Sequence, residues 1–174
     1  MLHSLGLQYD ELEDRLILVI TVKQAETLVD QTLWLTRRIS LNLRHQLEHL
    51  KKLAPVVSRA IDAQAQAATA EINHEVQAQQ ARVKRETQPT RPFNRAAAVL
   101  VKATACTYNP TAVQGSIRFE FVKGGPLTLN LSEPSLHGFI RVIDNNLQRA
   151  QWATAPEAGA ATSPPAARAA GPIH

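Results

Sequence analysis

Residues 15–22 read Arg-Leu-Ile-Leu-Val-Ile-Thr-Val, and this stretch decides the fold. It is rich in branched aliphatic residues, which favour the pleated backbone of a β-strand. Alternate positions of a strand point to opposite faces, and here both faces are apolar. We therefore expect a strand that is covered on both sides. The segment is far too short to span a bilayer.

The flanking residues extend this strand into a three-stranded meander. Leu5, Leu7 and Tyr9 alternate with polar or small residues, which is the period of a half-buried strand. The acidic residues 10–14 indicate a turn, and a third strand is expected over residues 32–35. A helix should then begin after Thr36, a suitable N-cap, with an apolar stripe at Ile39, Leu43, Leu47 and Leu50. Residues 1–54 are therefore predicted to form a β-β-β-α unit.

A second unit with the same order is predicted over residues 96–152. Its strands are expected at about 98–108, 116–122 and 127–131, and Gly124-Gly125 is a hairpin signal between the last two. Ser132 is placed to cap a final helix that has Pro134 in its first turn. The apolar stripe of that helix comprises Leu136, Phe139, Ile140, Ile143 and Leu147.

The two units align by eye, which suggests an internal duplication. Gln8-Tyr9-Asp10 matches Thr107-Tyr108-Asn109, and residues 32–36 match residues 128–132. The expected fold class is α+β: two antiparallel meanders, each followed by a helix, joined by a long helical connection. We expect the two sheets to merge into one layer with the helices packed on one side. A pseudo-twofold arrangement of this kind favours binding or assembly over catalysis in a cleft.

The connection between the units is predicted as a helix over residues 55–88, followed by a linker at 89–95. Pro55 fits the first turn of a new helix, and residues 56–86 contain neither Gly nor Pro and are rich in Ala, Gln and Glu. Its sparse large apolar residues are Val57, Ile61, Ile72, Val76 and Val83. Either this helix is a spacer along the sheet, or it is an arm that pairs with another copy of the chain.

Composition adds general expectations. Residues 153–174 are rich in Ala and Pro without apolar periodicity, so we expect a disordered tail. The sequence has a single cysteine and no visible secretory signal, which together favour the cytoplasm, and its net charge is +4. The charge permits an anionic partner without arguing for one, and no membrane partner is expected.

The reverse faces of the two meanders differ in polarity. In the second unit this face carries Ser116, Arg118 and Glu120, which water can solvate. The matching face of the first unit carries Ile17, Val19 and Trp34. Leaving those three side chains in water would expose an apolar patch typical of interfaces, so we expect a cover. Either the long helix over residues 56–86 folds back onto this face, or a second protein chain binds there.

No motif singles out a reaction. His45-Gln46-Leu47-Glu48-His49 matches the H-x-x-E-H pattern of inverted zinc peptidases, but both histidines are expected on the solvent face of their helix among cations. Cys106 lies in a predicted strand without a histidine partner, which favours an inert thiol. We therefore expect no enzymatic activity, no cofactor and no metal.

Two basic clusters offer a different function. The first comprises Arg37, Arg38, Arg44, Lys51 and Lys52, with Arg59 nearby, and the second comprises Arg82, Lys84, Arg85, Arg91 and Arg95. Such clusters can bind phosphates with a steep dependence on salt. No aromatic residue interleaves with them, so the stacking platform of single-strand binders is missing.

The sequence therefore favours a non-catalytic protein-interaction or assembly module, acting as a homodimer or an adaptor. Its contact surface would use Ile17, Val19 and Trp34, or the arm around Ile61, Ile72 and Val76. The alternative is a nucleic-acid-binding protein that uses the two basic clusters.

Overall fold

The computed structural model describes residues 2–85 and 94–152, apart from the side chains of residues 24 and 82–85. The strands are β1 (Leu2–Asp10), β2 (Arg15–Gln24), β3 (Thr27–Thr36), β4 (Val99–Asn109), β5 (Gln114–Phe121) and β6 (Leu127–Ser132). The helices are α1 (Arg37–Lys51), α2 (Pro55–Ser58), α3 (Ala63–Arg85) and α4 (Glu133–Arg149), with a short 3₁₀ turn, η1 (Arg95–Ala97). The α+β class expected from the sequence is confirmed.

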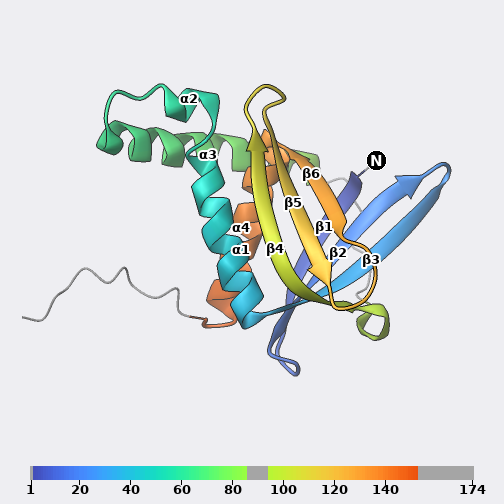
Figure 1. Ribbon diagram of the computed structural model, residues 1–174. Helices are drawn as coiled ribbons and strands as arrows, with labels where there is room; N and C mark the ends of the chain where they lie inside the picture. The colour runs from blue at the N-terminus through green and yellow to red at the C-terminus, as the bar shows by residue number, and fades with distance from the viewer. Residues whose placement is uncertain (1, 86–93, 153–174) are drawn as a thin grey trace, which may run out of the picture.

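The six strands form one sheet in the order in which they occur in the chain, as expected for two merged meanders. Neighbouring strands within β1–β3 and within β4–β6 are antiparallel. The two meanders join through a short parallel contact in which Leu33 pairs with Val99 and Trp34 pairs with Leu100. Beyond this junction β3 and β4 diverge, and the β2–β3 hairpin projects away from the rest of the sheet (Figure 1).

Helices α1 and α4 pack side by side on one face of the sheet, where the main hydrophobic core lies (Figure 1). Each helix lies against the first strand of the other meander: α1 packs on β4 and α4 packs on β1. Side chains also bond to these strands. Gln46 of α1 donates to the carbonyl of Thr104 at 3.0 Å, and Asn146 of α4 donates to the carbonyl of Leu7 at 3.3 Å. The two meanders therefore share one core.

The first turns of the two meanders have the same geometry. Asp10 Oδ1 accepts hydrogen bonds from the amides of Leu12 and Glu13, two and three residues later. Asn109 Oδ1 accepts in the same way from the amides of residues 111 and 112. Each turn ends on a residue with positive φ, Asp14 at 46° and Val113 at 50°. Because short Asx side chains can replace a backbone bond, both turns are stabilised locally.

The helical connection differs from the continuous helix expected from the sequence. It breaks between α2 and α3, and α3 restarts where Asp62 Oδ1 accepts a 2.7 Å hydrogen bond from the amide of Ala65. Val57 is buried against Ala54 and Ala70, which folds α2 back onto α3. Among the described residues, no helix combines the length and the apolar character needed to cross a membrane.

The expectation that the long helix covers the reverse face of the first meander is wrong. Helix α3 packs on α4, at the other side of the sheet from Ile17 and Val19. Both of these residues are buried, and η1 packs beside β3, with Asn94 and Arg95 lining a recess over Ile17. Arg95 Nε lies 2.6 Å from Asp10 Oδ2 and so ties this segment to β1.

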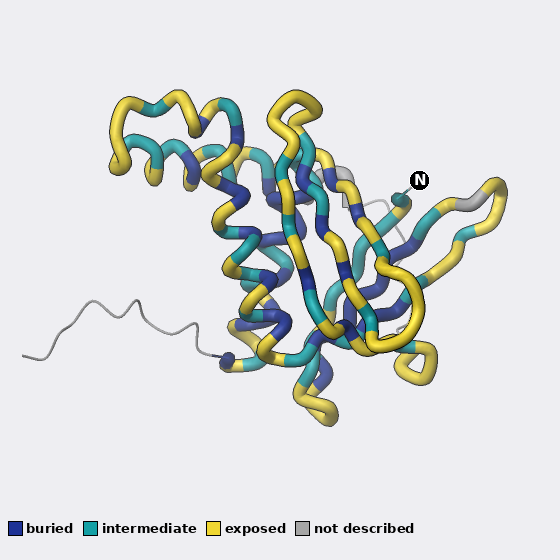
Figure 2. Tube along the Cα trace, viewed as in Figure 1, coloured by how far each residue is buried: buried dark blue, intermediate teal, exposed yellow. Residues whose placement is uncertain are grey.

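The reverse face of β4–β6 is solvated, as its polar sequence predicts. Exposed positions run along all three strands on the outside of the sheet (Figure 2). Arg118 and Glu120 are both about half exposed and face each other at 3.5 Å. The predicted tail at 153–174 lies outside the described residues.

Candidate functional site

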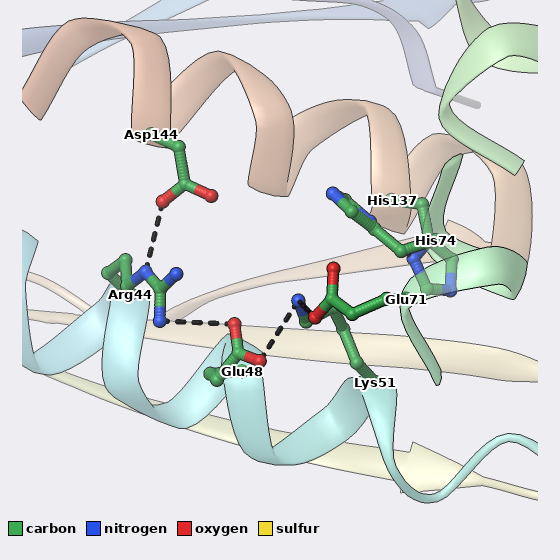
Figure 3. A network of polar contacts seen from close by, with 7 residues as sticks. All are labelled: Arg44, Glu48, Lys51, Glu71, His74, His137 and Asp144. Atoms are coloured by element: carbon green, nitrogen blue, oxygen red, sulfur yellow. Dashed lines mark hydrogen bonds and ion pairs between the residues drawn. The ribbon is translucent and has the colours of Figure 1, made fainter. Parts of the chain in front are cut away.

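A cluster of charged and titratable side chains lies where α1, α3 and α4 meet (Figure 3). It comprises Arg44, Glu48, Lys51, Glu71, His74, His137 and Asp144. We call it the junction network. Its five charged residues alternate in sign along a chain of ion pairs, and the two histidines lie beside them. Apart from the pairs within α1, every contact in this network joins two different helices.

The charged part of the network is a continuous chain of ion pairs. Asp144 Oδ1 of α4 lies 3.0 Å from Arg44 Nε, and Arg44 Nη1 lies 3.0 Å from Glu48 Oε2. Lys51 Nζ then lies 2.9 Å from both Glu48 Oε1 and Glu71 Oε1. The chain crosses from α4 through α1 to α3, so it fixes the relative register of three helices.

Lys51 is the buried centre of this chain. Its side chain is 5% exposed, whereas its partner Glu71 is 66% exposed. The hydrogen bond from Lys51 lowers the pKa of Glu71, despite the opposing effect of partial burial. A buried ammonium is tolerated because two carboxylates surround it.

The histidine pair joins α3 to α4. His74 Nδ1 and His137 Nδ1 lie 2.8 Å apart, and the rings are tilted at 44°. Burial lowers the pKa of His137 to about 4, with further contributions from His74 and Lys51. Burial likewise lowers the pKa of His74, followed by the charge of Lys51. Both rings are therefore neutral near pH 7.

Apart from the histidine pair, the contact between α3 and α4 is formed by small and polar side chains. Ala70 and Ala78 are the buried residues among the described side chains of α3. Asn73 donates to Glu133 Oε1 at 2.9 Å, and Glu75 pairs with Arg141 at 3.1 Å. The buried side chains of α3 are alanines, so the polar pairs contribute much of the specificity of this contact.

The opposite side of the connection is apolar and exposed. The exposed large hydrophobic residues there are Leu53, Val56, Ile61, Ile72 and Val76. Ile61 is 100% exposed and Ile72 is 67% exposed. Ile72 and Val76 are four residues apart on α3, so they lie on one face of that helix. We call residues 53–81 the helical arm.

The structure separates the predicted interface residues into two groups. Ile17 and Val19 are buried, so they are not available for direct contact with a partner. Trp34 is half-buried on the same face, with the Arg15 guanidinium 6.0 Å from its ring centroid. Ile61, Ile72 and Val76 are all exposed, and the structure brings the last two together on α3.

The first basic cluster is not a continuous cationic surface. Arg37, Arg38 and Lys52 are exposed as expected. Arg44 and Lys51 are instead paired with carboxylates in the junction network. In the second cluster, Arg95 is paired with Asp10. The side chains of Arg82, Lys84, Arg85 and Arg91 lie outside the described residues.

The motif residues take the positions expected of them. His45 and His49 are exposed on α1, facing away from the core. Burial raises the pKa of the Cys106 thiol to about 12, so the thiol is protonated near neutral pH. Within residues 2–85 and 94–152 no group of three His, Cys, Asp or Glu side chains is placed to hold a metal ion.

Sequence reasoning missed the histidine pair and Asp144. His74 and His137 are 63 positions apart, and Arg44 and Asp144 are 100 positions apart. Polar side chains on the inner face of an expected amphipathic helix were the available signal: His137 falls between Leu136 and Phe139 in the apolar stripe of α4.

No protein-family model matches this sequence, and a search of curated proteins finds no match.

Proposed function

We propose that this protein is a non-catalytic interaction module and that the helical arm is its contact surface. One observation carries the proposal: of the eleven exposed large hydrophobic residues in the described part of the chain, five lie between positions 53 and 76. The arm also extends past the ends of α1 and α4 (Figure 1). Clustered exposed apolar side chains of this kind mark surfaces that bind other proteins.

The energetic gain from a partner is substantial. Burying Ile72 and Val76 would each contribute about 1.5–3 kcal/mol by side-chain transfer values. Glu71 and Glu75 border this face and are already paired with Lys51 and Arg141, so they add little uncompensated charge. A partner with an apolar centre and a polar rim would fit this surface.

Site-specific photo-crosslinking tests the arm in the native cell. A benzophenone amino acid at position 72 should crosslink to a protein, either a second copy or a foreign chain. The matched control is position 122, where Val122 is 68% exposed in the turn between β5 and β6. Crosslinks at position 72 that disappear in the Val76→Gln background support the proposal, whereas equal labelling at both positions, or none, refutes it.

Sedimentation velocity distinguishes the two kinds of partner. A homodimer should dissociate with dilution and should be lost in the Ile72→Gln/Val76→Gln variant. The Val122→Gln variant should associate like the natural chain. A monomer at every concentration eliminates self-association and leaves an adaptor role to the crosslinking test.

We also propose that the two meanders arose by internal duplication. The matching Asx turns and the reciprocal packing of α1 on β4 and α4 on β1 support this proposal. Replacing residues 109–113 with the sequence of residues 10–14 should preserve the fold, with a stability change below about 1 kcal/mol, within the range of tolerated surface changes. Unfolding of that chimera would contradict equivalence of the two turns.

A nucleic-acid partner is the second candidate, because of Arg37 and Arg38. Both are exposed in the first turn of α1, where the helix dipole disfavours cations by about 0.3–1 kcal/mol each. A bound phosphate would offset that cost. A gel shift at two salt concentrations tests this candidate, and absence of binding at the lower concentration eliminates it.

A further inference from the structure

The contact between His74 and His137 requires a defined arrangement of protons. Their Nδ1 atoms lie 2.8 Å apart, and a ring nitrogen accepts a hydrogen bond only when it carries no proton. One ring must therefore donate through Nδ1–H and the other must accept through a bare Nδ1. His137 Nε2 lies 4.0 Å from Glu133 Oε1, which favours a proton on that nitrogen. His74 is therefore the donor and His137 the acceptor.

Acid changes this contact in two steps. The first added proton can bind to Nε2 of His74, and the hydrogen bond between the rings survives. The second must bind to Nδ1 of His137, after which both facing nitrogens carry hydrogen and no acceptor remains. Because His137 is 1% exposed, the two imidazolium rings would then repel each other without solvation by water.

Charged groups from three elements surround this pair. They are Glu48 and Lys51 on α1, Glu71 and Glu75 on α3, and Glu133, Arg141 and Asp144 on α4. Lys51 adds to the repulsion. The carboxylates already have partners: Lys51 for Glu71, Arg141 for Glu75 and Asn73 for Glu133. They therefore offset only part of a second positive charge.

Besides the histidine pair, α3 is held by the polar pairs Lys51–Glu71, Asn73–Glu133 and Glu75–Arg141, and it buries few apolar side chains. Ala70 and Ala78 are the buried residues among its described side chains. An element with so little buried apolar area belongs to the regions of a protein that open most readily. Loss of one interhelical contact can therefore change the position of the whole helix.

We propose that the His74–His137 contact is an acid-sensitive latch that holds α3 on α4 near neutral pH and opens when both rings are protonated. The latch would regulate the helical arm, a consequence that rests on the function proposed above. The lowered pKa of both histidines also indicates that the closed contact disfavours protonation of the rings. The open form binds more protons than the closed form between pH 6.5 and about 4, so closure is favoured above this range and lost as the pH falls through it.

Hydrogen–deuterium exchange of the full chain at pH 7.5 and pH 5.0, corrected for intrinsic exchange rates, tests the latch. A fall in the pKa of His137 from 6.5 to about 4 corresponds to opening of α3 on the order of thirtyfold more frequent at pH 5.0. The strands should keep their protection. The double variant His74→Asn/His137→Asn should lose this pH response, whereas the control His45→Asn/His49→Asn, altered at exposed positions of α1, should retain it.

Two results would overturn the latch: unchanged α3 protection in the natural chain, or the same pH response in the His74→Asn/His137→Asn variant. If that variant does not fold, nitrogen NMR of the natural chain at pH 7.5 decides. One imidazole must carry its proton on Nδ1 and the other on Nε2, and two Nε2–H rings would refute the contact. Hydrogen exchange reports on α3 in the absence of any partner, whereas the crosslinking test depends on a partner and is performed with the latch closed. A negative exchange result therefore refutes the latch without refuting the proposed function.

Discussion

Trp152 donates a hydrogen bond from Nε1 to Oδ1 of Asp14 at 3.0 Å, across 138 positions of the sequence. The same oxygen accepts a 2.8 Å bond from the hydroxyl of Tyr9, and the Tyr9 and Trp152 rings meet edge to face at 5.7 Å. Asp14 also ends the first turn with a φ of 46°. One residue therefore closes the β1–β2 turn and fixes the end of α4 to it.

Replacing Asp14 with alanine should destabilise the protein by about 2–3 kcal/mol, because two hydrogen bonds to a charged group are lost and alanine is strained at positive φ. Asp14→Asn should cost less, since asparagine tolerates this backbone and keeps an acceptor. Urea unfolding followed by tryptophan fluorescence measures both changes. Equal stability of the two variants would show that Asp14 acts through its charge alone.

Removing the buried ammonium of Lys51 should weaken the chain of ion pairs that connects the three helices. The Lys51→Met variant leaves Glu48 and Glu71 without their shared cation and should lose about 2 kcal/mol, less than a fully buried pair because Glu71 is largely exposed. The neighbouring Lys52 is exposed, so Lys52→Met is the matched control and should change stability by less than about 0.5 kcal/mol. Thermal unfolding compares them directly.

Gly115 is needed for close packing of β5 against α4. A β-carbon at this position would lie 2.9 Å from Cδ2 of Leu136, which is buried in the core. Gly115→Ala should therefore cost about 1 kcal/mol or more, as small overpacking changes do. A β-carbon at Gly125 meets no atom within 4 Å, so Gly125→Ala should be neutral. A smaller loss at Gly115 than at Gly125 would show that Leu136 moves aside freely.

The Cys106 thiol should be unreactive in the native protein. Burial raises its pKa from 9.0 to about 12, so at pH 8 the thiolate population is about a thousandfold smaller than in an unfolded chain. Labelling with a disulfide reagent should therefore be slow until guanidinium is added. Rapid labelling of the folded chain at pH 8 would contradict this burial.

Local patterns predicted the elements that local chemistry controls. The apolar run at 15–22 and the leucine spacing of α1 are periodic signals, the acidic residues 10–14 are a turn signal, and the structure confirms the elements that they indicate. The break before α3 also had a local signal, because Asp62 is a suitable N-cap. The absence of Gly and Pro from residues 56–86 had instead favoured a continuous helix. Fold class therefore followed from the sequence.

The candidate site could not be predicted in the same way. Lys51 resembles its exposed neighbour Lys52 in sequence, and only the docking of α3 buries it. His74 and His137 become partners because of a helix contact between distant segments. Ile17 and Val19 on the reverse face of β2 are buried, but the long helix does not cover them, since α3 packs its small residues on α4.

Each helix packs on the first strand of the other meander, and this arrangement has a consequence during synthesis. When β1, β2 and β3 leave the ribosome, the helix that covers β1 has not yet been translated, because α4 begins at Glu133. The nascent N-terminal half therefore exposes an apolar face of its sheet until α4 has been synthesised. A state of this kind binds chaperones and favours aggregation. Contacts between such distant segments also slow folding of the finished chain.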